Sequence, residues 1–239
     1  MKLTIVTQIR NESKRLNEWI KYHSKIYNVD LFSFYLDQPE DNSKEILDEL
    51  KNEYNIEYRY TNPFGEYNGN NCAVATERQR ESFKDGYNRL KYEYDWIAIF
   101  DVDEWIVPVD LKNYNLKNYL NELKENMIYI PMYNFRPPFD YNKSIIEQDF
   151  HRWSTKERFE NGHGTCGKSI IKGKIFLDRL VNINVHTGPE GIEEYHNNVD
   201  FKSKNHKFRL HQFQNHMNHS GKPYEIYDDS IKKIFKKYD

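Results

Sequence analysis

Two aspartates follow directly on a strongly apolar stretch of the chain, which reads WIAIFDVDEW over residues 96–105. In open α/β sheets ligands bind beyond the carboxyl ends of the strands, and alternate residues of an extended chain point the same way. Asp101 and Asp103 can therefore face one crevice, where their mutual repulsion favours a bound cation. Carboxylate oxygens suit Mg²⁺ or Mn²⁺, and either ion can also bridge a diphosphate. Two acids in a surface turn would show the same spacing, but their position behind a buried strand favours a divalent metal site.

Three histidines near the end of the chain form a second candidate cluster. His211, His216 and His219 have the spacing His-x4-His-x2-His, which could hold zinc or serve a metal-dependent nuclease. Neither of the two cysteines lies near them, and the spacing matches no strong zinc signature. We therefore favour polar packing or substrate contacts for this cluster. His23 falls on the apolar side of a helical pattern, which favours a packed core histidine over a ligand.

Alternating strands and helices must position these residues. Short apolar runs predict strands over residues 3–9, 31–36, 56–60 and 95–100. Helical spacing predicts helices between them, over residues 15–27, from 41 or 42 to 54, and 71–92. Strands separated by helices indicate βαβ units, so we expect an α/β fold with a mostly parallel central sheet and helices on both faces.

The second half of the chain is less regular. We expect a helix over residues 116–125 and strands over 127–133, 169–171 and 180–185, with a long functional loop over 135–167. The tail, residues 226–239, predicts a basic amphipathic helix, because four lysines alternate with Ile231, Ile234, Phe235 and Tyr238. Such a helix could lie on an anionic bilayer or dock on the domain, and we slightly favour docking.

Composition excludes several classes of protein. The 239 residues carry a net charge of -2, which lacks the basic signature of general nucleic-acid binding, so no nucleic-acid partner is expected. Two cysteines make no disulfide framework and indicate a reducing compartment. No apolar run approaches the length of a membrane span, and the first residues lack a signal-peptide pattern. We therefore expect a cytoplasmic protein, with the tail as its one candidate for peripheral contact with a membrane surface.

Several motifs, in the same order, resemble the GT-A-type nucleotide-sugar glycosyltransferases, above all those of the family-2 and family-92 type. The first are RNE at residues 10–12 and EWIKYH at 18–23, followed by a strand that ends in an acid, FYLD at 34–37, and by DNS at 41–43. Gln79, FDVDEW at 100–105, GKSII at 167–171 and NVH at 184–186 come next. The resemblance covers about residues 3–190.

This resemblance implies a single GT-A-like, Rossmann-like domain over residues 1–225, with a nucleotide-binding half (1–107) and an acceptor-side half (108–225). It implies a metal-dependent glycosyltransferase that uses Mn²⁺ or Mg²⁺ and moves a sugar from a nucleoside-diphosphate donor, with UDP as the expected carrier, to a glycan or lipid-linked acceptor. The residues that it places around the nucleotide are Thr7, Arg10, Asp37 and Gln79.

Four further residues would handle charge in an enzyme of this kind. By resemblance, Asp101 would lie near the ribose and the metal, and Asp103 would ligate the metal. Lys168 would neutralise the diphosphate, and His186 would contact the metal or the diphosphate. Such a cation and a metal ion stabilise the negative charge that develops on the leaving diphosphate.

An inverting mechanism, which we favour over retention, also needs a carboxylate that takes the proton of the acceptor hydroxyl. We expect this base on the acceptor side, within residues 133–160. The candidates there are Asp140, Glu147 and Asp149.

Three other functions remain open from the sequence. A nucleotidyltransferase would also combine an α/β sheet with metal-binding carboxylates, but it would usually have a Gly-rich loop after the first strand, and residues 8–12 contain no glycine. A non-catalytic glycan-binding module could use the many aromatic residues for stacking on sugars. A histidine-metal nuclease is the weakest of the three.

Overall fold

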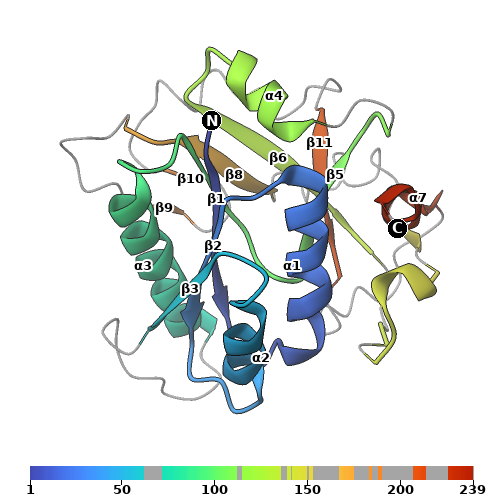
Figure 1. The fold of residues 1–239 in the computed structure, drawn as a ribbon, viewed down its shortest axis with the longest axis horizontal. Helices are drawn as coiled ribbons and strands as arrows, with labels where there is room; N and C mark the ends of the chain where they lie inside the picture. Colours follow the sequence, from blue (N-terminus) through green and yellow to red (C-terminus); the bar gives the residue numbers. More distant parts are fainter. Residues whose placement is uncertain are drawn as a thin grey trace.

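The computed structural model describes residues 1–61, 72–111, 115–135, 139–140, 142–149, 151–152, 167–174, 183–184, 188–189, 207–213 and 226–238. An eight-stranded sheet forms the centre of the molecule, in the order β3-β2-β1-β4-β8-β6-β11-β5 (Figure 1). Its strands are β1 (Leu3–Ile9), β2 (Leu31–Leu36), β3 (Ile56–Tyr60), β4 (Trp96–Ile99), β5 (Glu104–Pro108), β6 (Met127–Asn134), β8 (Gly167–Lys172) and β11 (Phe208–Gln212).

Strand direction divides the sheet into two parts. β3, β2, β1 and β4 are parallel neighbours, and β6 and β11 are parallel to each other. β8 is antiparallel to both β4 and β6, and β5 is antiparallel to β11. Six strands therefore run one way and only β8 and β5 run the other, which confirms the expected α/β fold with a mostly parallel sheet.

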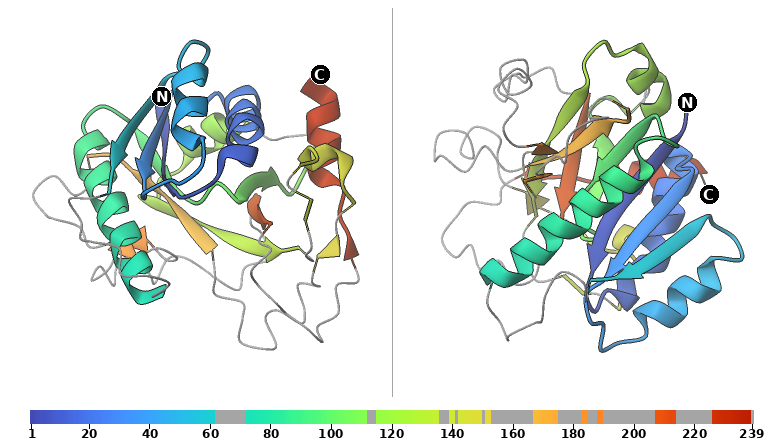
Figure 2. Two further views of the ribbon diagram at one scale, coloured as in Figure 1. Left: turned by 90° about the horizontal axis from the view of Figure 1, so that it is seen from below. Right: turned by 90° about the vertical axis from the view of Figure 1, so that its left-hand side faces the viewer.

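Helices cover both faces of the sheet. The helical elements are α1 (Ser13–Tyr27), α2 (Ser43–Leu50), α3 (Cys72–Leu90), α4 (Leu116–Glu122), the 3₁₀ turn η2 (Ile145–Glu147) and α7 (Ser230–Tyr238). Figure 2 shows α1 and α2 on one side of the strands and α3 on the other. In β4 the side chains alternate accordingly, because Trp96 and Ala98 pack in the core beneath α1 while Ile97 and Ile99 pack beneath α3.

Helix α1 illustrates how the sequence produces these layers. Its buried residues, which recur at helical spacing, are Leu16, Trp19, Ile20, Tyr22, His23, Ile26 and Tyr27. The carbonyl of Glu12 accepts the first helical hydrogen bonds, from the amides of Arg15 and Leu16. The helix ends at Asn28, which adopts a left-handed conformation (φ 50°) and donates its amide to the carbonyl of Ser24.

The structure differs from the sequence-based expectation in several elements. Helix α2 ends at Leu50 instead of residue 54, because residues 51–53 form a turn. The sequence does not predict the strands β5 and β11, which pair with each other over Glu104–Pro108 and Phe208–Gln212. The expected long loop contains η2 and the short strand β7 (His151–Arg152). Of the strand predicted at 180–185, the structure describes β9 (Ile183–Asn184), which pairs with β10 (Gly188–Pro189).

The C-terminal helix is shorter than expected and docks on the domain. Residues Ile226–Tyr227 form strand β12, which pairs with β7, so that α7 begins only at Ser230. Its apolar residues Ile231, Ile234 and Phe235 are buried, and the ring of Phe235 lies 5.0 Å from that of Tyr22 in α1. The docking interpretation of the tail is therefore correct, and the apolar side of α7 faces the protein. Of the helices described, none has the length and apolar character needed to cross a bilayer.

Helix α3 lies so close to β1 that only glycine fits at position 86. A Cβ atom there would lie 2.5 Å from Cγ1 of Val6, and Gly86 is in the interior of the helix. We expect Gly86→Ala to lower the free energy of unfolding by about 1–3 kcal/mol through overpacking, measured by urea denaturation. At an unconstrained helical position the same change would raise stability by about 1 kcal/mol. A more stable variant would therefore contradict the close packing.

Candidate active site

Three carboxylates gather in the turn between β4 and β5. The amide of Glu104 donates to the carbonyl of Asp101 at 3.0 Å, and the amide of Asp101 donates to Oε2 of Glu104 at 2.9 Å. These two bonds close the turn and bring one carboxylate oxygen each of Asp101, Asp103 and Glu104 within 4.8 Å of one another. Asp101 and Asp103 thus share one site, as the sequence predicts, and Glu104 is a third acid that the sequence argument did not single out.

Lys168 brings a positive charge into contact with these acids. Because β8 lies beside β4 with Ser169 opposite Ile99, Lys168 stands next to the carboxyl end of β4. Its ammonium donates to Oδ2 of Asp101 at 2.8 Å and lies 3.7 Å from Oε1 of Glu104. Gln79 of α3 donates its amide to Oδ1 of Asp101 at 2.6 Å. The fold therefore brings Gln79 and Lys168, which lie 22 and 67 residues from Asp101 in the sequence, to the acid turn that holds Asp101 and Asp103.

Burial controls the charge on this cluster. Glu104 is fully buried, which raises its pKa well above the usual value, although the ammonium of Lys168 opposes this effect. Burial alone would lower the pKa of Lys168, but the carboxylates of Asp101 and Glu104 outweigh it and raise that pKa. Lys168 therefore stays charged.

The donor atoms suit a hard divalent cation. Among the described residues the ligand atoms that gather here are carboxylate oxygens, and one ammonium offsets at most one of the three acids. Glu104 is turned inward, where it holds the amide of Asp101, while the side chain of Asp101 is 23% exposed. Each carboxylate oxygen can accept more than one bond, so Asp101 can bind a cation while it holds Lys168 and Gln79. Asp101 and Asp103 thus fit Mg²⁺ or Mn²⁺, with Glu104 behind them.

Glu12 is a further acid near this cluster. It lies between β1 and α1 within the RNE motif, and its amide donates to the hydroxyl of Ser43 at 3.1 Å. Burial, together with the charges of Asp103, Asp101 and Asp41, raises the pKa of Glu12 to about 7, against the opposing effect of Arg15. The motif had drawn attention to this position, but its link to the acid turn emerges only from the fold.

A buried ion pair involves Asp37, one of the residues expected around the nucleotide. Asp37, directly after β2, accepts two hydrogen bonds from Arg78 of α3, both 2.9 Å long, and a third from the hydroxyl of Thr61. Thr7 is fully buried within β1, and Arg10 is partly exposed just beyond that strand. Asp37 therefore ties α3 to the end of β2, a role that its sequence position did not reveal because Arg78 is 41 residues away.

Local hydrogen bonds occupy the three candidate bases. Oδ1 of Asp140 accepts the amide of Asn142, and Oε2 of Glu147 accepts the amide of Ser144 in a capping box. Asp149 accepts from the ammonium of Lys232 at 2.7 Å. Asp140 and Glu147 therefore shape the 139–149 segment, and Asp149 ties it to α7.

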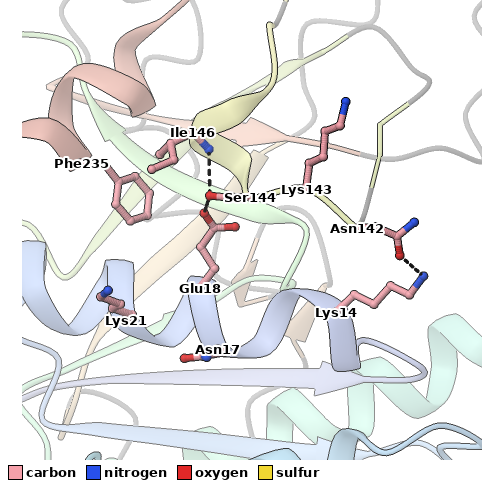
Figure 3. Close-up of a pocket in the computed structure, with 9 residues that line it drawn as sticks. All are labelled: Lys14, Asn17, Glu18, Lys21, Asn142, Lys143, Ser144, Ile146 and Phe235. Carbon is pink, nitrogen blue, oxygen red and sulfur yellow. Dashed lines mark hydrogen bonds between the residues drawn. The ribbon is translucent and has the colours of Figure 1, made fainter.

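The same segment forms one wall of a groove along the outer face of α1 (Figure 3). The groove has a volume of about 360 Å³, and Lys14, Asn17, Glu18 and Lys21 line it on the helix side. Glu18 joins the two walls because its carboxylate accepts the hydroxyl of Ser144 (Figure 3). The same carboxylate also accepts the amide of Ile145. The groove thus lies beside the candidate bases.

Two of the described histidines, His23 and His211, lie in the protein interior. His211 in β11 is buried; its Nε2 accepts from Nε of Arg209 at 2.8 Å, and its ring lies 4.6 Å from that of Phe135. His23 is fully buried, which lowers its pKa to about 3, so it is a neutral core residue as the sequence predicts. The expected metal contact His186 and the cluster residues His216 and His219 lie outside the described residues.

The raised pKa of Glu12 gives a pH-dependent prediction. The folded state holds this proton up to about pH 7, so the stability that Glu12 contributes is complete below about pH 4.5 and is lost as the pH rises through about 7. Without divalent cations, Glu12→Gln should equal the wild type in free energy of unfolding at about pH 5 and exceed it at about pH 8. Denaturant titrations at both pH values measure this difference. The exposed Glu40→Gln is the control, and equal behaviour of the two variants would contradict the link between Glu12 and the acid turn.

The chain is similar to several known proteins. A family 92 glycosyltransferase protein of Oryza sativa subsp. japonica is 28% identical over 130 residues, which make up 51% of this chain and 20% of the rice protein. Staphylococcus aureus TarS 1–349, solved alone and in complex with UDP, is similar in structure with a TM-score of 0.45 and 15% identity, over 72% of this chain and 47% of TarS. Mannosyl-3-phosphoglycerate synthase from Rubrobacter xylanophilus gives a TM-score of 0.42 and 12% identity, over 72% and 53%. The chain thus spans about a fifth of the rice protein and about half of each of these structures. The profile of glycosyltransferase family 92 matches residues 6–238, so the chain belongs to that family.

Proposed function

We propose that this protein is a metal-dependent glycosyltransferase that moves a sugar from a UDP-sugar to a hydroxyl group of a glycan or lipid-linked acceptor, with inversion. The observation that carries the proposal is the acid turn at the carboxyl end of β4, with Asp101 and Asp103 beside the ammonium of Lys168. Ligands of α/β sheets bind at this edge, next to the ends of β1 and β2. Membership of glycosyltransferase family 92 supports the class of reaction.

The residues of the site have distinct tasks in this reaction. A divalent ion held by Asp101 and Asp103 would act as a Lewis acid toward the leaving diphosphate. Lys168 offsets the same developing charge, and Gln79 holds the carboxylate of Asp101 in place from α3. Thr7 and Arg10 would border the nucleotide, with the Asp37–Arg78 ion pair as the wall behind it.

Transfer with inversion needs one proton acceptor. The acceptor hydroxyl oxygen bonds to the anomeric carbon, the bond from that carbon to the diphosphate oxygen breaks, and UDP leaves with the electron pair. The hydroxyl proton passes to a carboxylate. We assign this task to Asp140 or Glu147, because both lie on the segment that borders the groove on α1.

Metal-dependent donor binding tests the proposal. At about 100 times Kd, UDP with Mn²⁺ should stabilise the protein by about 2.7 kcal/mol and raise the melting temperature by about 5–10 °C. Asp103→Asn, which keeps the shape of the side chain, should abolish the shift, while the exposed Asp110→Asn should keep it. A shift that survives in Asp103→Asn would remove Asp103 from the metal site. Sugar binding that ignores both Mn²⁺ and UDP would instead identify a glycan-binding module.

Two amide substitutions identify the base. Asp140→Asn and Glu147→Gln each keep an oxygen that can accept the local amide, so both variants should fold normally. The variant that removes the base should lower kcat for UDP release from the UDP-sugar by about 10²–10⁴-fold with little change in the donor KM. If both variants keep full activity, neither residue is the base.

A further inference from the structure

The strand that leads away from the acid turn has an open edge. Among the described strands β5 is the last in the sheet, with β11 as its neighbour on one side. The backbone groups of Glu104 and Ile106, two residues apart, therefore point away from β11, because alternate residues of an antiparallel strand point to opposite neighbours. Both residues are buried, so these groups need hydrogen-bond partners from elsewhere.

Four side chains of α1 supply these partners. Nε1 of Trp19 donates to the carbonyl of Glu104 at 2.8 Å. The hydroxyls of Tyr22 and Tyr27 both donate to the carbonyl of Ile106, at 2.6 and 2.7 Å. The amide of Ile106 points to Nε2 of His23 at 3.4 Å, while Nδ1 of His23 lies 2.9 Å from the carbonyl of Trp19. Helix α1 thus takes the place of a neighbouring strand.

These contacts reach the acid turn through Glu104. Glu104 takes part in three hydrogen bonds here. Its carbonyl accepts from Trp19, its amide donates to the carbonyl of Asp101, and its carboxylate accepts from the amide of Asp101. A shift of Glu104 along the edge of the sheet would therefore move all three carboxylates. Because Trp19 is fully buried on α1, the position of Glu104 depends on that helix.

We infer that Trp19 is a positioning residue for the metal site. Tyr22, His23 and Tyr27 support it by binding the backbone of Ile106, two residues farther along β5. They act on the acids through the backbone of β5 and touch no reacting atom. The inference rests on the proposed function only in naming the metal as what the acids bind. It also gives a reason for the EWIKYH motif, in which Trp19, Tyr22 and His23 lie on the same side of α1.

The experiment compares Trp19→Phe with Ile20→Ala. Both change a fully buried residue of α1, but only Trp19 donates to β5. The readouts are the Mn²⁺ Kd, measured by electron paramagnetic resonance, and amide hydrogen exchange of residues 101–108 without any ligand. Trp19→Phe should weaken Mn²⁺ binding about 10-fold, as expected for loss of a group that orients metal ligands, and should speed exchange in this segment. Ile20→Ala should leave both Mn²⁺ binding and amide exchange unchanged, even when it lowers the melting temperature as much as Trp19→Phe does.

A second set of variants tests the same inference in case Trp19→Phe fails to fold. Tyr22→Phe and Tyr27→Phe each leave one donor on the carbonyl of Ile106, so the single variants should resemble the wild type. The double variant should show faster exchange at residues 101–108 and weaker Mn²⁺ binding. Unchanged exchange in both Trp19→Phe and the double variant would overturn the inference. Absence of Mn²⁺ binding in the wild type would instead overturn the proposed metal site, and the exchange measurement would then decide only whether Trp19 holds the acid turn in place.

Discussion

Three carboxylates confined to one turn are the constraint on which this structure depends. Like charges at this distance repel, and burial adds to the free-energy cost of ionising them. Lys168 supplies a compensating positive charge, because the antiparallel strand β8 places it at the end of β4. Gly167 makes this approach possible, since a Cβ atom there would lie 2.4 Å from both the carbonyl oxygen of Ile130 and the ring of Tyr129. One ammonium does not offset three carboxylates, which is the electrostatic basis of the metal site that we propose.

The same constraint explains where β5 begins and what holds it at the edge of the sheet. The strand must leave the acid turn at once, because Glu104 is both the last residue of the turn and the first residue of the strand. On one side β11 pairs with it and places Gln212 opposite Glu104, and the amide of Phe213 binds the carbonyl of Asp103. On the other side α1 supplies side-chain donors. The acids are therefore held from two directions by segments that lie about 85 and 108 residues away in sequence.

Sequence reasoning succeeds here where structure is local. β1 to β4 and the helices between them follow from apolar runs and helical spacing, and Asp101 and Asp103 follow from their position behind such a run. Sequence reasoning fails for β5 and β11. The β5 segment, EWIVP, merges with the apolar stretch before the turn, and the β11 segment, FRLHQ, shows no clear alternation of apolar and polar residues. Their pairing spans about a hundred residues and has no local signal. Glu104 and Arg78 were missed for the same reason, since only the fold brings each of them to its partner.

The charges of the site are also consistent with the donor that we propose. Burial raises the pKa of Glu104 and so opposes a third negative charge, while the carboxylates of Asp101 and Glu104 raise the pKa of Lys168 and keep it positive. A divalent ion would add two positive charges beside Asp101 and Asp103, which favours the approach of a diphosphate. The metal would thus be required before the donor, because without it the site would present acids to an anion.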